Sequence, residues 1–140
     1  MLADGWLYPV WVVGASRMRV VEDDWPRDGS RLHHSLGAWP LLINDDTEVV
    51  ESRPESLLSL RGRGWPLGEV AIVIRTRPVG AETEVVIEED VVAGPGRLVP
   101  KPVRALALRW RNIETLRRLA YIAERRTAAN STDPEDRDDL

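Results

Sequence analysis

Two ionisable side chains occupy positions where the sequence pattern predicts the interior of a sheet. His34 alternates with leucines in residues 30–37, and Glu89 alternates with Val and Ile in residues 82–92. Because successive strand residues point to opposite faces, both side chains should point inward with these apolar neighbours. An imidazole titrates near neutral pH and a buried carboxylate can accept a proton, so His34 and Glu89 are the candidate catalytic residues. Each could also be a hydrogen-bonded structural residue.

A basic and an amide side chain fall inside or beside the apolar arc of the helix predicted for residues 99–126, namely Arg109 and Asn112. An inward Arg and an inward Glu cannot both stay buried without a partner. We therefore expect Glu89 to pair with Arg109, which would leave guanidinium donors free for a ligand carboxylate, phenolate or carbonyl. The alternatives are that the pair only fixes the helix on the sheet, or that Arg109 reaches the rim.

The chain contains six Trp and no Phe. Indoles combine a large apolar area with one N–H donor, so Trp11, Trp39 and Trp110 are predicted pocket walls, with ordinary core packing as the alternative for each. The predicted ligand-binding residues are Trp11, His34, Trp39, Glu89, Arg109, Trp110 and Asn112.

Several kinds of site are excluded or not expected. The chain has no Cys, so it forms no disulfide, thiolate metal site or Cys nucleophile. His33 and His34 are adjacent on a strand and point to opposite faces, so they cannot chelate one metal. The acidic runs lack the spacing of a calcium loop, and neither a G-x-S-x-G nor a G-x-G-x-x-G motif is present. We expect no metal and no cofactor.

The longest predicted element is a helix over residues 99–126, where Pro102 suits the first turn and no further Gly or Pro follows. On a helical wheel its apolar arc, predicted to face the sheet, comprises Leu106, Trp110, Ile113, Leu116, Leu119, Ala120 and Ala123. The side chains predicted to face solvent are Arg104, Arg111, Glu114, Arg118 and Arg125.

The segments before this helix read as strands with short turns. Residues 1–14 are aromatic and broken by Gly and Pro, which favours two short helical turns. The predicted strands are residues 17–22, 30–37, 41–53, 56–63, 69–77 and 82–92. The order predicts an α+β fold in which a curved antiparallel β-sheet surrounds a long C-terminal α-helix.

Length and charge indicate one domain, residues 1–126, followed by an acidic tail, residues 127–140, predicted to be disordered. The tail carries the whole net charge of −4, and the neutral remainder indicates no nucleic-acid partner. No signal peptide and no membrane-spanning stretch is recognisable, which predicts a cytoplasmic protein without stable membrane insertion. A membrane-surface role for the basic amphipathic helix is disfavoured because its apolar arc is needed for the sheet.

Five stretches together resemble a known superfamily: LADGWLYPVWVVGAS, the WP at Trp25-Pro26, RLHHSLGAWP, EVVIEEDVVAGPG and RWRNIETLRRLA. With the order of elements, they resemble the helix-grip fold of the START-like, or SRPBCC, superfamily, in its polyketide cyclase/dehydrase-like branch of small bacterial proteins. That fold normally opens with a β-strand before the small helices. This chain starts inside the helix, so either the true start lies upstream or the sheet lacks an edge strand, and an uncovered edge is prone to pairing.

The resemblance implies a cavity between sheet and helix, because members of the superfamily bind lipids, sterols, polyketides, quinones or hormones there. We expect a binding module for a hydrophobic, aromatic or lipid-like small molecule. One alternative is a polyketide cyclase or dehydratase in which His34 or Glu89 moves protons and Arg109 stabilises an enolate. Another is an interaction protein that forms a homodimer through its exposed sheet edge, with a vestigial cavity. Whether the chain is an enzyme stays open.

Overall fold

The computed structural model describes residues 1–38, 40–64 and 68–131. Its elements along the chain are η1 (Gly5–Leu7), α1 (Tyr8–Trp11), β1 (Ala15–Val21), β2 (Arg31–Ala38), β3 (Leu41–Arg53), β4 (Leu57–Gly64), β5 (Gly68–Val79), β6 (Glu82–Ala93), η2 (Pro95–Leu98) and α2 (Lys101–Ser131). The predicted strands and the two short helical turns are confirmed, and each strand begins and ends within two residues of its predicted bounds.

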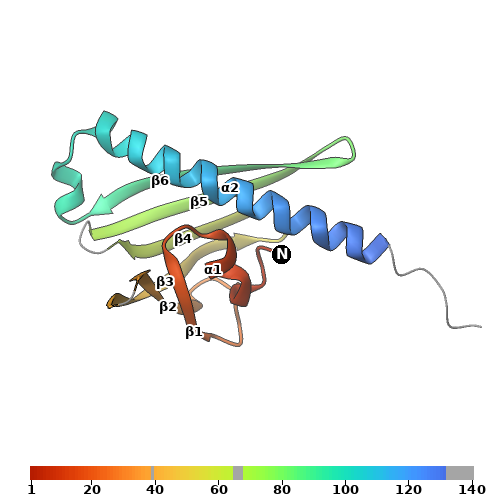
Figure 1. Ribbon diagram of the computed structural model, residues 1–140, viewed down its shortest axis with the longest axis horizontal. Helices are drawn as coiled ribbons and strands as arrows, with labels where there is room; N and C mark the ends of the chain where they lie inside the picture. Colours follow the sequence, from red (N-terminus) through yellow and green to blue (C-terminus); the bar gives the residue numbers. More distant parts are fainter. Residues whose placement is uncertain (39, 65–67, 132–140) are drawn as a thin grey trace, which may run out of the picture.

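The strands form one antiparallel sheet in which each strand pairs with its neighbours in the chain, in the order β1-β2-β3-β4-β5-β6 (Figure 1). The strands β1 and β6 are therefore its two edges. Register shifts interrupt the β1–β2, β3–β4 and β5–β6 ladders, and such bulges increase local twist and bend a sheet. The result is the predicted α+β architecture, a curved sheet with one long C-terminal helix, which is consistent with a helix-grip fold.

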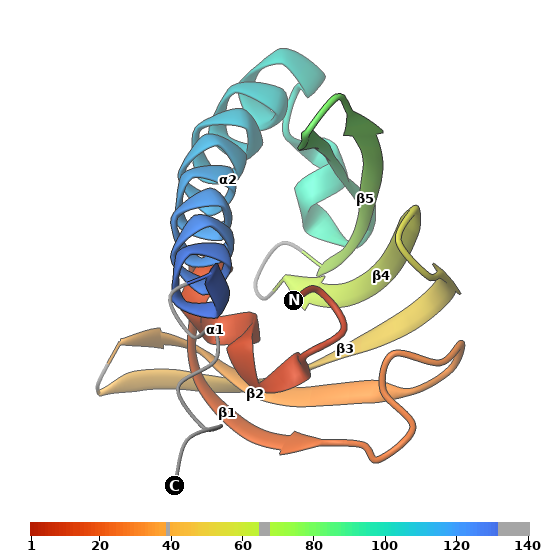
Figure 2. The same cartoon turned by 90° about the vertical axis from the view of Figure 1, so that its right-hand side faces the viewer.

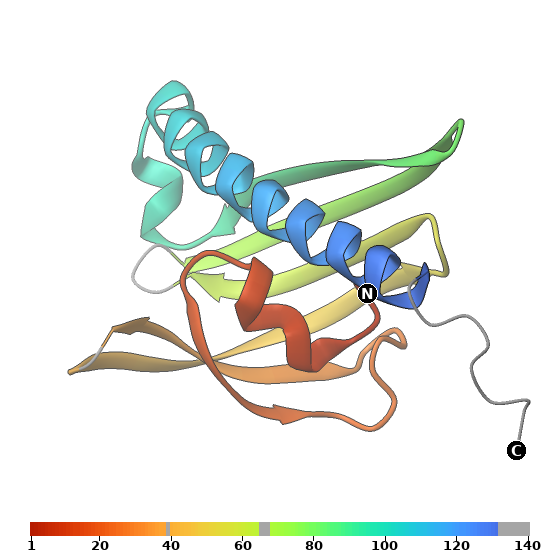
Figure 3. The same ribbon diagram turned by 45° about the vertical axis from the view of Figure 1, so that its right-hand side comes forward.

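Both helices lie on the same face of the sheet, and the sheet curls around them (Figures 2 and 3). The short helix α1 packs on β1 and also contacts α2. The core between these layers takes apolar side chains from the middle strands and from both helices. Its most deeply buried members are Tyr8, Trp11, Leu32, Val49, Leu60, Ile74 and Leu119. Burial of these side chains is what holds the helices to the sheet, at about 1.5–3 kcal/mol for each large apolar group.

The opposite face of β5 and β6 carries charged residues that pair across the strands. Arg75 pairs with Glu88, and Arg77 pairs with Glu84. The alternation in β6, with Val85, Ile87 and Glu89 inward and the other acids outward, confirms a sheet with one buried face.

The predicted rotation of the long helix is wrong. Leu106 is 70% exposed, Trp110 is 71% exposed and Ile113 also faces solvent, although all three were expected to pack on the sheet. The side chains that α2 turns inward are Leu108, Arg111, Asn112, Thr115, Leu119 and Ile122.

The reason is that α2 has apolar residues on two sides, so apolarity alone does not predict its rotation. On the side that faces the sheet, two ion pairs accompany the buried Leu119. Arg104 donates to Asp90 at 2.8 Å, and Arg111 pairs with Glu89. Both Arg104 and Arg111 were predicted to face solvent, and both instead hold the helix to β6.

The helix α2 continues to Ser131, five residues beyond the predicted end, so residues 127–131 of the expected tail are helical. Residues 132–140 lie outside the described part of the chain. In the described part, no helix combines the length and apolarity needed to cross a bilayer.

Candidate functional site

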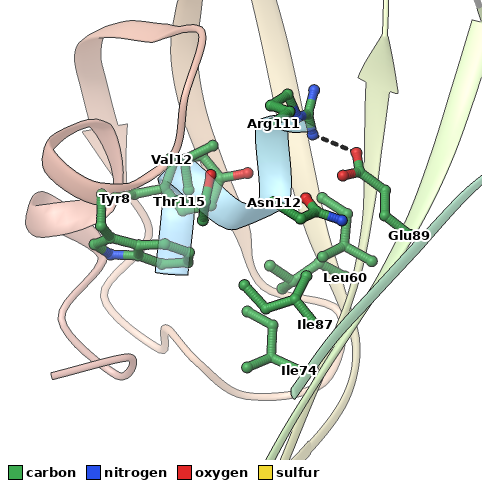
Figure 4. A pocket seen from close by; sticks show the side chains of 11 residues that line it. Tyr8, Val12, Leu60, Ile74, Ile87, Glu89, Arg111, Asn112 and Thr115 are labelled. Atoms are coloured by element: carbon green, nitrogen blue, oxygen red, sulfur yellow. Dashed lines mark hydrogen bonds and ion pairs between the residues drawn. The ribbon is translucent and has the colours of Figure 1, made fainter. Parts of the chain in front are cut away.

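A small cavity lies between α1, α2 and the concave face of the sheet (Figure 4). Its volume is about 20 Å³, which is room for one or two water molecules, whereas a cavity of about 150 Å³ accommodates a benzene ring. Its apolar wall comes from Trp11, Val12, Leu60, Ile72, Ile74 and Ile87. Its polar side chains are Glu89 from β6 and Arg111, Asn112 and Thr115 from α2. One side of an otherwise apolar cavity is therefore charged.

The charged side of the cavity is the ion pair between Glu89 and Arg111. The Glu89 side chain is 1% exposed and that of Arg111 is 34% exposed, so the carboxylate is buried and the guanidinium reaches the surface. Glu89 Oε2 and Arg111 Nε are buried without a hydrogen-bond partner among the described residues. Buried polar atoms are usually satisfied, so these two atoms are exceptions to the usual pairing.

Burial raises the pKa of Glu89, and the favourable interactions with Arg111 and Asn112 oppose this rise. The raised pKa means that the carboxyl holds a proton to a higher pH than an exposed glutamate would. A carboxyl of this kind can accept or donate a hydrogen bond to a bound molecule.

The inward position of Glu89 follows the sequence prediction, but its predicted partner is wrong. Arg109 lies exposed on the outward side of α2, and Arg111 takes its place. The two residues are about 200° apart around the helix axis, so the error in helix rotation accounts for the exchange.

The polar wall of α2 is also tied to α1. Thr115 is buried and its Oγ1 accepts a hydrogen bond of 3.3 Å from the backbone N–H of Val13. Asn112 lies one turn earlier in α2 and directs its side chain toward Glu89 (Figure 4). The contact fixes the end of α1 against the helix that covers the sheet.

A second buried polar cluster lies next to the cavity and is organised by Thr47. His34 Nε2 and Thr47 Oγ1 are 2.9 Å apart, and the Tyr8 hydroxyl is 3.5 Å from the same oxygen. The Tyr8 and His34 rings have centroids 5.3 Å apart. Tyr8 also lines the cavity, whereas His34 is not among its lining residues.

The interior holds His34 in its neutral form. Burial lowers the pKa of His34 to about 4, and the nearby charge of Asp46 opposes this only in part. The Tyr8 hydroxyl has a raised pKa, again chiefly because it is buried. Asp45, which is paired with His34 across the strands, has its pKa raised by burial as well, and its Oδ2 makes no hydrogen bond in the described residues.

The structure brings together only some of the predicted binding residues. Trp11, Glu89 and Asn112 line the cavity, and His34 lies outside its lining with its ring next to that of Tyr8. Trp110 is the clearest correction, because its indole faces solvent and forms no wall. Trp39 lies outside the described residues.

Sequence reasoning missed five residues of the site, Tyr8, Asp45, Thr47, Arg111 and Thr115. The two strand residues were accessible to it, since Asp45 and Thr47 alternate with buried Val49 and must share its face. The two helix residues depended on a rotation that the pattern did not determine. Across residues 1–38, 40–64 and 68–131, no three His, Asp or Glu side chains gather as a metal site.

Comparison with known proteins adds the fold but no family. No protein-family model matches the chain, and no curated protein matches it. A protein from Rhodobacter sphaeroides, solved by crystallography as a structural-genomics target, superposes with a TM-score of 0.65. It is 20% identical, and the match covers 88% of this chain and 80% of that one. The chain therefore has the same fold as that protein.

Proposed function

We propose that this chain binds a small, largely apolar molecule with one polar group in the space between the sheet and α2. The observation that carries the proposal is the buried Glu89–Arg111 pair, which faces an apolar cavity with two unsatisfied polar atoms. Apolar walls would supply the affinity. The Glu89–Arg111 ion pair, together with Asn112, would orient a carboxylate, phenolate or carbonyl of the ligand.

The cavity has to expand to accept such a molecule, because its volume of about 20 Å³ holds only water. The wall that would move is α2. Among the described residues, its polar attachments to the sheet and to the N-terminal segment include Arg104 to Asp90, Arg111 to Glu89, Thr115 to the backbone of Val13 and Arg126 to Asp4. A ligand group that replaces Glu89 as the partner of Arg111 would release one of these attachments and allow α2 to move outward.

The test uses the intact chain and a panel of aromatic and alkyl carboxylates, each with its uncharged amide. Binding is measured by native mass spectrometry and by quenching of tryptophan fluorescence, to which Trp11 in the cavity wall should contribute. We expect carboxylates to bind more tightly than their amides. The decisive variant is Glu89→Met/Arg111→Met, because replacing a buried ion pair with apolar residues of similar size usually preserves folding. This double variant should bind each carboxylate and its uncharged amide equally tightly.

The matched control is Arg75→Met/Glu88→Met, which removes an ion pair from the same two-strand ladder on the outer face. It should keep the preference for carboxylates. Equal binding of acid and amide by the unaltered protein, or no binding of any member, would contradict the proposal.

This proposal is consistent with the resemblance to the START-like superfamily, whose polyketide cyclase-like branch we propose as the origin of the chain. In the related enzymatic proposal, Glu89 is the proton-transfer residue, since it lines the cavity and its pKa is raised by burial. His34 is less suited because it does not line the cavity. An enzyme would lose turnover in Glu89→Gln while retaining ligand binding.

A homodimer through the sheet edge is a separate proposal, which the position of β6 at the edge of the sheet supports. On its outward face the strand carries Glu82, Glu84, Glu88 and Asp90, and two copies side by side would bring these acids together. We therefore expect any such dimer to strengthen with added salt, which light scattering would detect as a doubled mass.

A further inference from the structure

The outward side of α2 and the turn before it form an exposed apolar surface that the fold and the cavity leave unused. We call it the outer stripe, and it consists of Leu98 in η2 and of Val103, Leu106, Trp110 and Ile113 in α2. The spacings of three and four residues keep the helical members on one side. Their exposure ranges from 44% for Ile113 to 87% for Leu98.

Solvent contact of this extent is unusual for large apolar side chains in a contiguous row. Isolated apolar residues on a surface need no explanation, but a continuous patch generally marks an interaction site. The rotation of α2 makes the outer stripe available, because Leu119 and Ile122, on the other side of the helix, are the residues that pack in the core.

In the described part of the chain, cations without ion-pair partners flank the outer stripe. Residues 91–113 contain five basic residues and no acid, in a chain whose net charge is −4. Two of the five, Arg104 and Arg111, are bound to acids of β6. Among the described residues, Arg97 and Arg109 have no ion-pair partner, and Lys101 lies near Asp90, which Arg104 already binds.

We propose that the outer stripe docks on the surface of an anionic lipid bilayer. A helix lying in the plane of the interface would place Val103, Leu106 and Ile113 at the acyl boundary and Trp110 at the headgroup level, where indoles are enriched. The cations Arg97 and Arg109 would face the lipid phosphates. The surface lies on the opposite side of α2 from Glu89, so this inference does not depend on the cavity.

Charge complementarity favours a bilayer over a second copy of the chain. Two outer stripes face to face would bring their cations together, and residues 91–113 offer no acid to neutralise them. The first acid beyond them, Glu114, is already bound by Arg118 at 2.9 Å. An anionic surface satisfies both the apolar and the basic residues at once.

The test is co-sedimentation of the full chain with sucrose-loaded vesicles, made either of phosphatidylcholine alone or of phosphatidylcholine with phosphatidylglycerol at about three to one. We expect binding to the anionic vesicles to be at least about tenfold tighter and to weaken as salt rises. Arg109→Gln should reduce binding about fivefold, the value of one basic residue near such a surface. Trp110→Gln should reduce it at least about tenfold.

The matched control is Trp6→Gln, because Trp6 is an exposed indole (59%) on η1, away from the outer stripe. Its vesicle binding should equal that of the unaltered chain. Circular dichroism of each variant confirms that the fold is retained, which surface substitutions allow.

Three results would overturn the inference: no binding to anionic vesicles, equal binding to neutral and anionic vesicles, or equal losses in Trp110→Gln and Trp6→Gln. A dimer that light scattering detects in the absence of lipid, and that Trp110→Gln abolishes, would also overturn it in favour of a second copy as the occupant.

Discussion

The buried imidazole of His34 makes the stability of this protein sensitive to acid. Burial lowers its pKa from 6.5 to about 4 in the folded chain, so between these values the unfolded chain binds more protons than the folded one. The free energy of unfolding therefore falls as the pH falls through this window. From these two pKa values, the loss attributable to His34 is about 2 kcal/mol between pH 7 and pH 5 and about 3 kcal/mol at pH 4.

Two buried carboxyls act in the opposite direction. Burial raises the pKa of Asp45 and Glu89, so in the folded chain they keep protons above their ordinary pKa. Each contributes stability that is full at low pH and is lost as the pH rises through its raised pKa. The acid response of the unaltered protein is the sum of these effects, and a variant is needed to separate His34 from the carboxyls.

The assay is urea denaturation at pH 7, 6, 5 and 4.5 of the unaltered protein and of His34→Gln, whose amide can still bond to Thr47 but does not titrate. The difference in the free energy of unfolding between the two proteins should shift by about 2 kcal/mol in favour of the variant between pH 7 and pH 5. The control is His33→Gln, since His33 lies on the other face of β2 with Asp46, 2.7 Å from its Nδ1. In that variant the contribution of His34 to the pH dependence of the free energy of unfolding should remain. A constant difference between His34→Gln and the unaltered protein from pH 7 to pH 5 would refute the reasoning.

Three further predictions concern the core and the helix rotation. Arg111→Met should lower the free energy of unfolding, measured by urea denaturation, by about 3 kcal/mol or more, because it leaves a buried carboxylate unpaired. Glu89→Gln should lower it less, because the arginine that remains reaches solvent. The reverse order would contradict the assigned burial. Trp110→Gln should change the free energy of unfolding by less than about 0.5 kcal/mol, whereas a core indole would lose several kcal/mol. Gly62→Ala should lower the melting temperature by several degrees, since its Cβ would lie 3.2 Å from Thr47 Oγ1 and overpacking costs about 1–3 kcal/mol. An unchanged melting temperature would contradict tight packing around Thr47.

The strands and their inward faces were predictable because a period of two leaves little freedom. Once Val85 and Ile87 are assigned to the core, Glu89 must follow them, and His34 must follow Leu32. The same reasoning applied to β3 would have found Thr47. The antiparallel order was equally accessible, because short turns connect every pair of consecutive strands.

The rotation of the helix was not predictable from apolarity. Trp110 and Leu108 lie on opposite sides of α2, and both sides present apolar residues at helical spacing. What decides between them is whether Arg111 can reach Glu89, which is a tertiary contact and leaves no periodic signal. The cavity volume was inaccessible for a similar reason, because it depends on how tightly Trp11 packs, and no sequence pattern encodes this.

The order of the strands has a consequence for how the chain folds during synthesis. Each strand pairs with its immediate neighbours along the polypeptide, so loops closed at each pairing are short and every hairpin can form as soon as its second half emerges. The helix α2, which covers the sheet, is synthesised last, because it begins at Lys101, after β6 has ended at Ala93. Until α2 packs on the sheet, Leu60 and Ile74 are not covered by it. During that interval the nascent protein exposes apolar surface that chaperones can bind and that can aggregate.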